Sequence, residues 1–192
     1  MHRGAPAMHL PDSDLAERVW DPFVRVFHWS LVSCVVLNFF VIDDGETAHQ
    51  LIGYIASGLV LARVIWGFVG SAHARFADFF PTPARLRAHL AALRGGQHTF
   101  HRGHSPLGAL MMLTLMALVL GLGVSGFLQT TDAFWGDERV QNIHERLASI
   151  LIALAGLHAA VAIVISRLER VNLIAAMITG VKRRPADPSQ QG

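Results

Sequence analysis

Four long stretches of the chain are mostly apolar, and they cover residues 24–42, 51–69, 107–128 and 147–165. A helix needs about 20 mostly apolar residues to cross the hydrocarbon core of a bilayer, and each stretch has roughly that length. Each is also bounded by charged residues, proline or glycine, which are typical of helix ends. The pattern predicts an all-α fold, an integral membrane four-helix bundle in contact with membrane lipid.

The basic residues are unevenly distributed among the segments outside these stretches. The connections 43–50 and 129–146 contain two arginines between them, Arg139 and Arg146, whereas the two ends of the chain and segment 70–106 contain most of the others. Lysine and arginine accumulate on the cytoplasmic side of membrane proteins. We therefore expect both termini and the middle loop in the cytoplasm of a bacterium, with the protein crossing the inner (cytoplasmic) membrane several times.

Composition narrows the class of protein further. Hydrophobic residues make up 52% of the 192 residues and charged residues 16%, which is too apolar for an ordinary soluble domain. The basic residues lie beside apolar spans, so no nucleic-acid partner is expected. A single cysteine, Cys34, excludes an internal disulfide and a C-x-x-C-H attachment of c-type haem. The first twenty residues contain Asp12, Asp14 and Glu17 and lack an apolar run, so we expect no cleaved signal peptide.

Two shorter segments, 83–93 and 171–179, predict helices that lie on the inner membrane surface. The first alternates leucine with arginine and histidine at helical spacing, and the second is a short apolar run before three basic residues. The chain then divides into a cytoplasmic tail (1–23), a four-helix transmembrane domain (24–182) and a disordered C-terminal tail (183–192).

Four of the eleven histidines lie in the apolar stretches or at their ends, where an ionisable side chain is costly and indicates function. His28 is near the inner end of the first helix, and His49 is at the outer end of the second. His144 and His158 are fourteen residues apart on the fourth helix, nearly four whole turns and about 21 Å. His144 is therefore level with His49, and His158 with His28. Two stacked pairs predict axial ligands for two haems inside the bundle.

Three arginines and a glycine extend the predicted cofactor site. Arg63 follows His49 by fourteen residues, so it lies at the inner level, where a haem propionate would pair with its charge. Arg25 and Arg146 flank two of the histidines and are candidates for the same role, although interfacial arginines explain them equally well. Gly53 leaves room for a porphyrin or for another helix.

The histidines also have structural explanations. A single histidine at a helix end is more often interfacial than a ligand, so the haem hypothesis depends on the matched depths of all four. The cluster of His98, His101 and His104 is interpreted as solvated, because it lacks cysteine or acidic partners for a metal. His104 is left open as a ligand, a propionate contact or a helix cap.

Several short motifs follow one another in order along the chain: R-V-F-H-W at 25–29, H-x3-G-Y at 49–54, R-x2-W-G-F-V-G at 63–70, H-S-P-L-G at 104–108, and H-E at 144–145 followed by His158. Together they resemble the bacterial cytochrome b561 family, which includes the b-type cytochrome subunits of membrane-bound nickel-iron hydrogenases. The resemblance implies a four-helix cytoplasmic-membrane protein with two b haems that exchanges electrons with the quinone pool. It also implies His28 and His158 as inner ligands, and His49 and His144 as outer ligands.

The outer connections indicate what kind of partner to expect. They carry seven acidic residues against two arginines, a net charge of −5, which would attract a basic protein. Taken with the resemblance, this charge leads us to expect an electron-transfer protein or quinone-linked oxidoreductase subunit. It would join the quinone pool to a basic periplasmic c-type cytochrome or redox enzyme subunit. Superoxide oxidation coupled to quinone reduction is an alternative, which the acidic face disfavours by repelling the anion. A histidine-based transporter or proton-conducting bundle is an alternative of another class.

Overall fold

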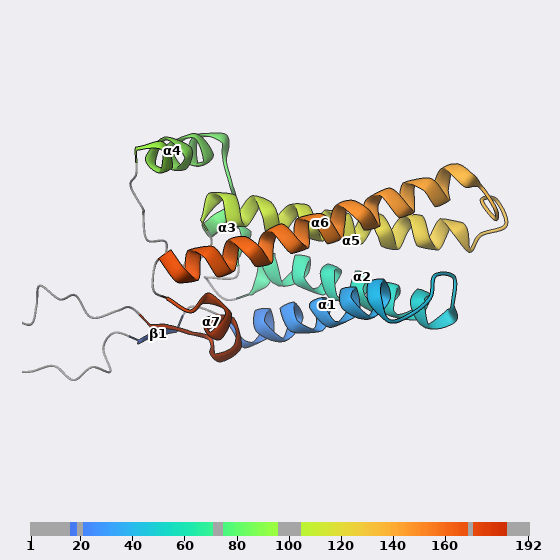
Figure 1. The fold of residues 1–192 in the computed structure, drawn as a ribbon, viewed down its shortest axis with the longest axis horizontal. Helices are drawn as coiled ribbons and strands as arrows, with labels where there is room; N and C mark the ends of the chain where they lie inside the picture. Colours follow the sequence, from blue (N-terminus) through green and yellow to red (C-terminus); the bar gives the residue numbers. More distant parts are fainter. Residues whose placement is uncertain (1–15, 19–20, 71–74, 96–104, 169–170, 184–192) are drawn as a thin grey trace, which may run out of the picture.

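The computed structural model describes residues 16–18, 21–70, 75–95, 105–168 and 171–183. Four helices are long and apolar enough to cross a membrane: α1 (Pro22–Phe40), α2 (Thr47–Val69), α5 (Pro106–Gln129) and α6 (Glu138–Leu168). They run side by side along the length of the molecule (Figure 1). The prediction of an all-α membrane helical bundle is confirmed.

Capping residues set where α1 and α5 begin. Pro22 and Pro106 occupy the first turns, where the missing N–H of proline breaks no helical hydrogen bond. The Asp21 and Ser105 side chains precede them and accept hydrogen bonds from backbone N–H groups of the first turn. Both helices therefore begin slightly before the apolar stretches themselves.

α6 begins nine residues earlier than its apolar stretch. The Asp137 carboxylate accepts a 2.8 Å hydrogen bond from the N–H of Arg139 and so caps the helix at this earlier point. α6 then runs unbroken from Glu138 to Leu168. His144, which precedes the apolar stretch, therefore lies in the second turn of the helix.

The four long helices pack unevenly. α1 lies against α2, α5 lies against α6, and α2 packs on α5 to join the two pairs, whereas α6 makes little contact with α1 or α2. The buried core gathers at mid-bundle and consists of Phe27, Ala56, Val60, Met116, Val119 and Leu151. In the part of the chain that the structure describes, Leu151 is the one buried residue of α6. The side of α6 that faces α1 and α2 is therefore sparsely packed.

The shorter elements gather at one end of the bundle, here called the inner end (Figure 1). α4 (Pro83–Arg94) and α7 (Leu173–Thr179) correspond to the two predicted surface helices. α3 (Phe76–Phe79) and the antiparallel pair β1 (Ala16–Arg18) and β2 (Val181–Arg183) were not predicted, because they are too short to show a period. The β1–β2 pair brings the two ends of the described chain together.

Some expectations fall on residues outside the described ranges. These are most of the tail 1–23, nearly all of the tail 183–192, and the histidine cluster His98, His101 and His104. Their roles stay predictions from the sequence.

Candidate functional site

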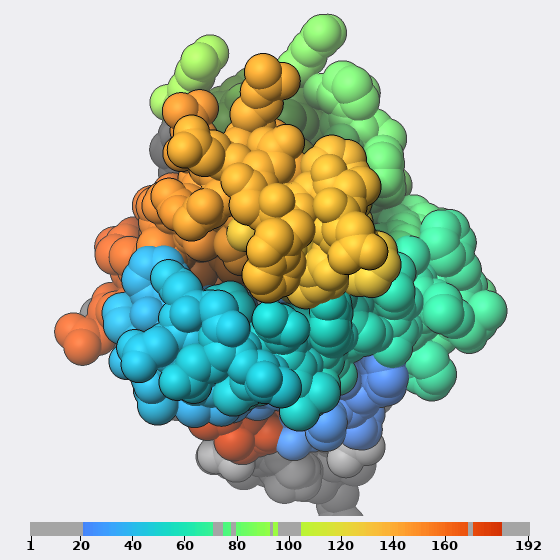
Figure 2. All heavy atoms as spheres, turned by 90° about the vertical axis from the view of Figure 1, so that its right-hand side faces the viewer, coloured from blue at the N-terminus to red at the C-terminus, as the bar shows by residue number. Residues whose placement is uncertain are grey.

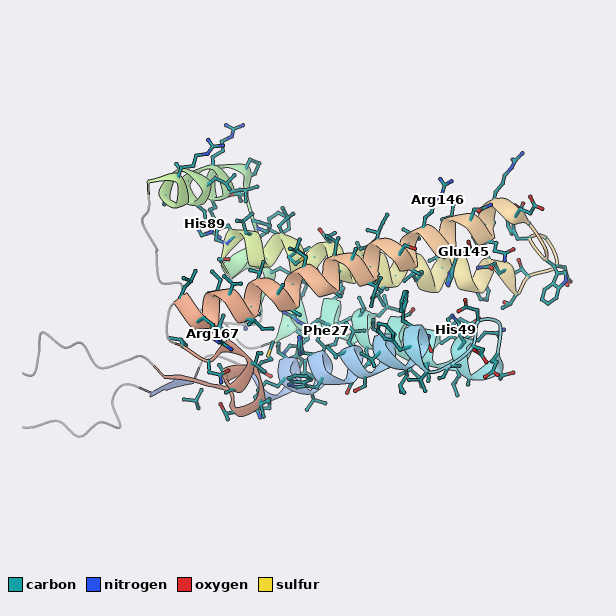
Figure 3. The ribbon with its side chains drawn as sticks, viewed as in Figure 1. Phe27, His49, His89, Glu145, Arg146 and Arg167 are labelled. Carbon is teal, nitrogen blue, oxygen red and sulfur yellow. The ribbon has the colours of Figure 1, made fainter. Side chains whose placement is uncertain are left out.

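His49 and His144 come together at the outer end of the bundle, opposite α4 and α7. His49 is in the first turn of α2 and is labelled in Figure 3. Its ring centroid lies 6.3 Å from that of His144, and the ring planes are inclined at 59°. Both residues are half-buried. The pair therefore bridges α2 and α6, two helices that otherwise hardly touch.

The spacing of these two rings fits a metal bound between them. Metal–nitrogen bonds to histidine are about 2 Å long, so two imidazoles on opposite sides of one haem iron have centroids roughly 6 Å apart. The Nδ1 atom of His144 already has a hydrogen-bond partner, Ser125 Oγ at 2.9 Å. Its Nε2 atom is then the nitrogen left for a metal.

His28 on α1 and His158 on α6 lie at the inner level. They are close enough for an electrostatic interaction between their rings. The Nδ1 atom of His28 is buried and has no hydrogen-bond partner among the described residues, whereas His158 is exposed. A buried nitrogen without a partner is costly. A haem at this level would supply contacts that the described protein atoms do not.

A layer of apolar side chains separates the two histidine levels. His144 and His158 are fourteen residues apart on one unbroken helix, which places them about 21 Å apart. Leu151 lies seven residues from each, and it packs with Val60 and Met116 in the buried core. The bundle therefore has two separate histidine sites with a packed middle.

Arg63 is the most deeply buried charged residue in the described part of the chain, with 1% of its surface exposed. Its guanidinium carbon lies 5.5 Å from the centroid of the Phe76 ring, and Asp21 interacts with it electrostatically. A Cβ built at Gly67 would come within 2.6 Å of Phe76 ring atoms, so this glycine admits the ring beside Arg63. Arg63 therefore lies at the inner level expected from its spacing from His49. Its guanidinium packs against Phe76, the first residue of α3.

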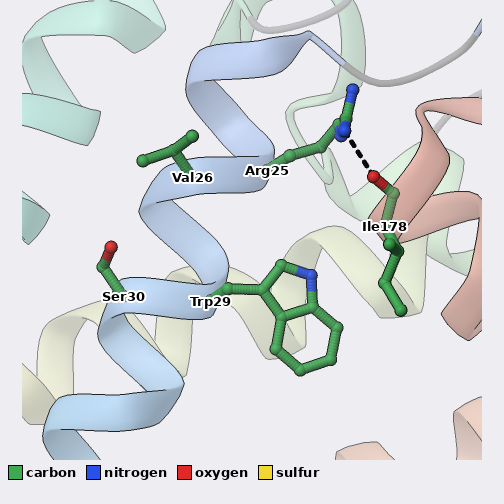
Figure 4. A pocket seen from close by; sticks show the side chains of 5 residues that line it. All are labelled: Arg25, Val26, Trp29, Ser30 and Ile178. Atoms are coloured by element: carbon green, nitrogen blue, oxygen red, sulfur yellow. Dashed lines mark hydrogen bonds between the residues drawn. The ribbon is translucent and has the colours of Figure 1, made fainter.

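Arg25 is directed toward α7, at the inner end of α1. Its guanidinium donates a hydrogen bond to the Ile178 carbonyl. Together with Val26, Trp29 and Ser30, these two residues line an open hollow of about 480 Å³ (Figure 4). The predicted propionate contact of Arg25 thus has a competing partner in the C-terminal helix.

The structure does not bring Arg146 or Gly53 into close contact with the histidine rings. Arg146 is exposed, and Figure 3 shows its side chain extending from α6 away from α1 and α2. A Cβ built at Gly53 would meet Asn38 Nδ2 at 3.7 Å, an ordinary contact. The roles of both residues in cofactor binding stay predictions from the sequence.

Three residues at the outer level were missed in the sequence. Ser125 bonds to the His144 ring, and a Cβ built at Gly126 would lie 3.3 Å from Cε1 of the same ring. Asn38 donates a 3.0 Å hydrogen bond to the His49 carbonyl and ties α1 to α2. A polar or small residue inside an apolar stretch is the signal that could have singled them out.

Comparisons with known proteins identify the family of the chain. Residues 19–180 match the prokaryotic cytochrome b561 family. A probable Ni/Fe-hydrogenase B-type cytochrome subunit from Rhizobium leguminosarum bv. viciae is 23% identical over 207 aligned positions, which cover 84% of this chain and 87% of that protein. No solved structure matches the chain significantly. Because the family match covers most of the sequence, the chain belongs to the prokaryotic cytochrome b561 family, and it is a multi-pass inner-membrane b-type cytochrome, a haem protein of electron transport.

Proposed function

We propose that the protein is a dihaem cytochrome b that passes electrons across the inner membrane between the quinone pool and a redox partner on its outer face. The observation that carries the proposal is the His49–His144 pair, whose ring spacing of 6.3 Å suits a shared iron. His158 lies about 21 Å from His144 along α6, and it forms a second pair with His28 of α1. One helix thus contributes a ligand to each of two sites.

The chain's own residues would hold the two sites apart and in place. α6 supplies His144 and His158, while His49 comes from α2 and His28 from α1. α6 makes little contact with α1 and α2, the two helices that carry the facing histidines. A b haem bound between two imidazoles supplies a one-electron couple at a six-coordinate iron. The apolar core around Leu151 keeps water from the region between the levels.

Arg63 is proposed to pair with a propionate of the inner haem. A guanidinium binds carboxylates in a fixed, bidentate geometry, and Arg63 is held at this level by packing over Phe76. Arg25, Arg146 and Gly53 are weaker candidates for contacts with the cofactors, because the structure directs none of them toward the histidine rings.

The outer face is proposed to dock a basic redox partner. The α1–α2 and α5–α6 connections meet there, as Figure 2 shows. The acidic residues of this end are Asp43, Asp44, Glu46, Asp132, Asp137, Glu138 and Glu145, and most are exposed. The relative named as a hydrogenase cytochrome subunit supports a redox enzyme subunit as the partner. A basic c-type cytochrome fits the same charge pattern.

The test is a haem count combined with histidine replacement. The purified protein is expected to show b-type bands in its reduced-minus-oxidised spectrum and about two haems per chain by the pyridine haemochrome assay. His28→Ala and His158→Ala should each remove the inner haem, and His49→Ala and His144→Ala the outer one. His89→Ala, on α4 outside the four spans, is the matched control and should keep both.

Two results would contradict the proposal. Wild-type protein without haem, made with ample haem supply, would leave a proton or solute pathway as the better explanation of the histidines. Equal loss of both haems in all four variants, with helix content unchanged by circular dichroism, would refute the assignment of two independent pairs.

A further inference from the structure

The ring of His144 is held by a side chain of the neighbouring helix α5. Ser125 is 5% exposed, and its Oγ lies 2.9 Å from Nδ1 of His144. The same Oγ donates a 3.2 Å hydrogen bond to the carbonyl of Leu122. That carbonyl also interacts directly with the His144 ring.

The direction of the Ser125–His144 hydrogen bond follows from counting protons. A serine hydroxyl has a single proton, and a carbonyl oxygen can only accept. When the Ser125 hydroxyl donates to the Leu122 carbonyl, its Oγ accepts from the ring, and Nδ1 of His144 carries the hydrogen. A neutral imidazole protonated on Nδ1 has its lone pair on Nε2. The α5 contacts therefore favour the tautomer with its hydrogen on Nδ1.

The orientation of the ring is restricted as well as its tautomer. Gly126 follows Ser125 on α5, and a Cβ there would lie 3.3 Å from Cε1 of His144, closer than ordinary van der Waals contact. The ring thus rests against the backbone of Gly126 while Ser125 holds one nitrogen. A side chain in place of the Gly126 hydrogen would displace the ring from this position.

We propose that Ser125 is a positioning residue of the outer site, which fixes the tautomer and orientation of His144 so that Nε2 binds the iron. The inference rests on the proposed function, because it takes His144 as a haem ligand. Hydrogen bonding to the second nitrogen raises the basicity of a ligating imidazole, which favours oxidised iron and lowers the reduction potential of the outer haem. The inner ligand His28 has no such bond among the described residues.

The experiment compares Ser125→Ala with Ser125→Thr, which keeps a hydroxyl, in the purified holoprotein. Ser149→Ala is the matched control, because the Ser149 hydroxyl donates a hydrogen bond to the Glu145 carbonyl of its own helix and bonds to no other helix in the described part of the chain. Potentiometric titration and the electron paramagnetic resonance spectrum are recorded for each variant. The outer haem is identified as the one that His144→Ala removes.

Ser125→Ala is expected to keep two haems and to raise the potential of the outer haem alone. Loss of such a hydrogen bond changes metal affinity by about tenfold or more. A tenfold change in the preference for oxidised over reduced iron corresponds to about 59 mV for one electron. Ser125→Thr should return the potential and the spectrum toward wild type, and Ser149→Ala should leave both unchanged.

The outcomes separate this inference from the proposed function. Two haems with wild-type potentials and spectra in Ser125→Ala would overturn the inference alone. If Ser125→Ala loses the outer haem, recovery of that haem and its spectrum in Ser125→Thr supports the role of the hydroxyl, and loss in both variants overturns it. Wild-type protein without haem would overturn both proposals together.

Discussion

Gly123 allows α2 and α5 to cross at close range, and replacing it by alanine tests the packing of the bundle. A Cβ built at Gly123 would overlap Ser57 Oγ and lie 3.1 Å from Ser57 Cβ, whereas ordinary contacts are 3.4–4 Å. Rotation of Ser57 cannot relieve the second contact, because Cβ is attached to the backbone. Gly123→Ala must therefore push the two helices apart.

The expected destabilisation follows from two opposing terms. Overpacking of a tight interface costs about 1–3 kcal/mol. Replacing glycine by alanine within a helix stabilises the folded state by roughly 1 kcal/mol, because alanine has the higher helix propensity. The net loss is therefore at most about 2 kcal/mol, which for a chain of this size lowers Tm by up to about 8 °C. Compared with a Gly→Ala change at an uncrowded helical position, the loss is the full ~1–3 kcal/mol.

The assay is thermal unfolding in detergent, followed by circular dichroism and by the haem absorbance. Gly156→Ala is the control, because nothing lies within 4 Å of its added Cβ and it should be neutral or slightly stabilising. Ser57→Gly should recover stability in the Gly123→Ala background, so that a double-mutant cycle gives a favourable coupling energy. Gly123→Ala as stable as Gly156→Ala, or a coupling energy near zero, would refute the reasoning.

Three further predictions concern charge and orientation. Arg63→Gln removes a buried positive charge at the inner level. It should lower the reduction potential of the inner haem by on the order of tens of millivolts and leave that of the outer haem unchanged. Equal shifts in both potentials would contradict the placement of Arg63 beside the inner haem. The rate of electron exchange with a basic c-type cytochrome should fall several-fold between about 10 and 150 mM salt, because the outer connections carry a net charge of −5; a rate independent of salt would remove the docking argument. In a Cys34→Ser background, Asp44→Cys should react with an impermeant thiol reagent on intact cells and Arg87→Cys only after permeabilisation, and the reverse pattern would invert the topology.

The long helices could be predicted because a transmembrane helix satisfies its backbone hydrogen bonds within its own segment. Length and hydropathy are then sufficient, and the four spans agree with the structure to within a few residues at most ends. The start of α6 is the exception, since Asp137 caps it nine residues upstream of the apolar stretch. The strands β1 and β2 depend on each other across the whole chain, and neither three-residue segment predicts strand formation alone.

The pairing of His49 with His144 could also be predicted, because residue spacing converts directly into depth along a straight helix. The contacts of Ser125 and Gly126 with His144 could not. They depend on how α5 is rotated about its own axis relative to α6. Because α5 is apolar on all sides, its hydropathy pattern does not indicate which side faces α6. The hydrogen bond from Arg25 to Ile178 likewise depends on where α7 folds back.

The sequence by itself determined the number of membrane spans, the levels of the histidines and of Arg63, and the family motifs. Each of these is a property of one segment, governed by helical rise and by the cost of polar groups in lipid. Only the tertiary structure decided which helix faces are close, that Gly123 rather than Gly58 or Gly156 is the tight crossing, and that Ser125 holds the His144 ring. These features arise from side chains of different helices, whose contacts are set by rotation and packing that no single segment encodes.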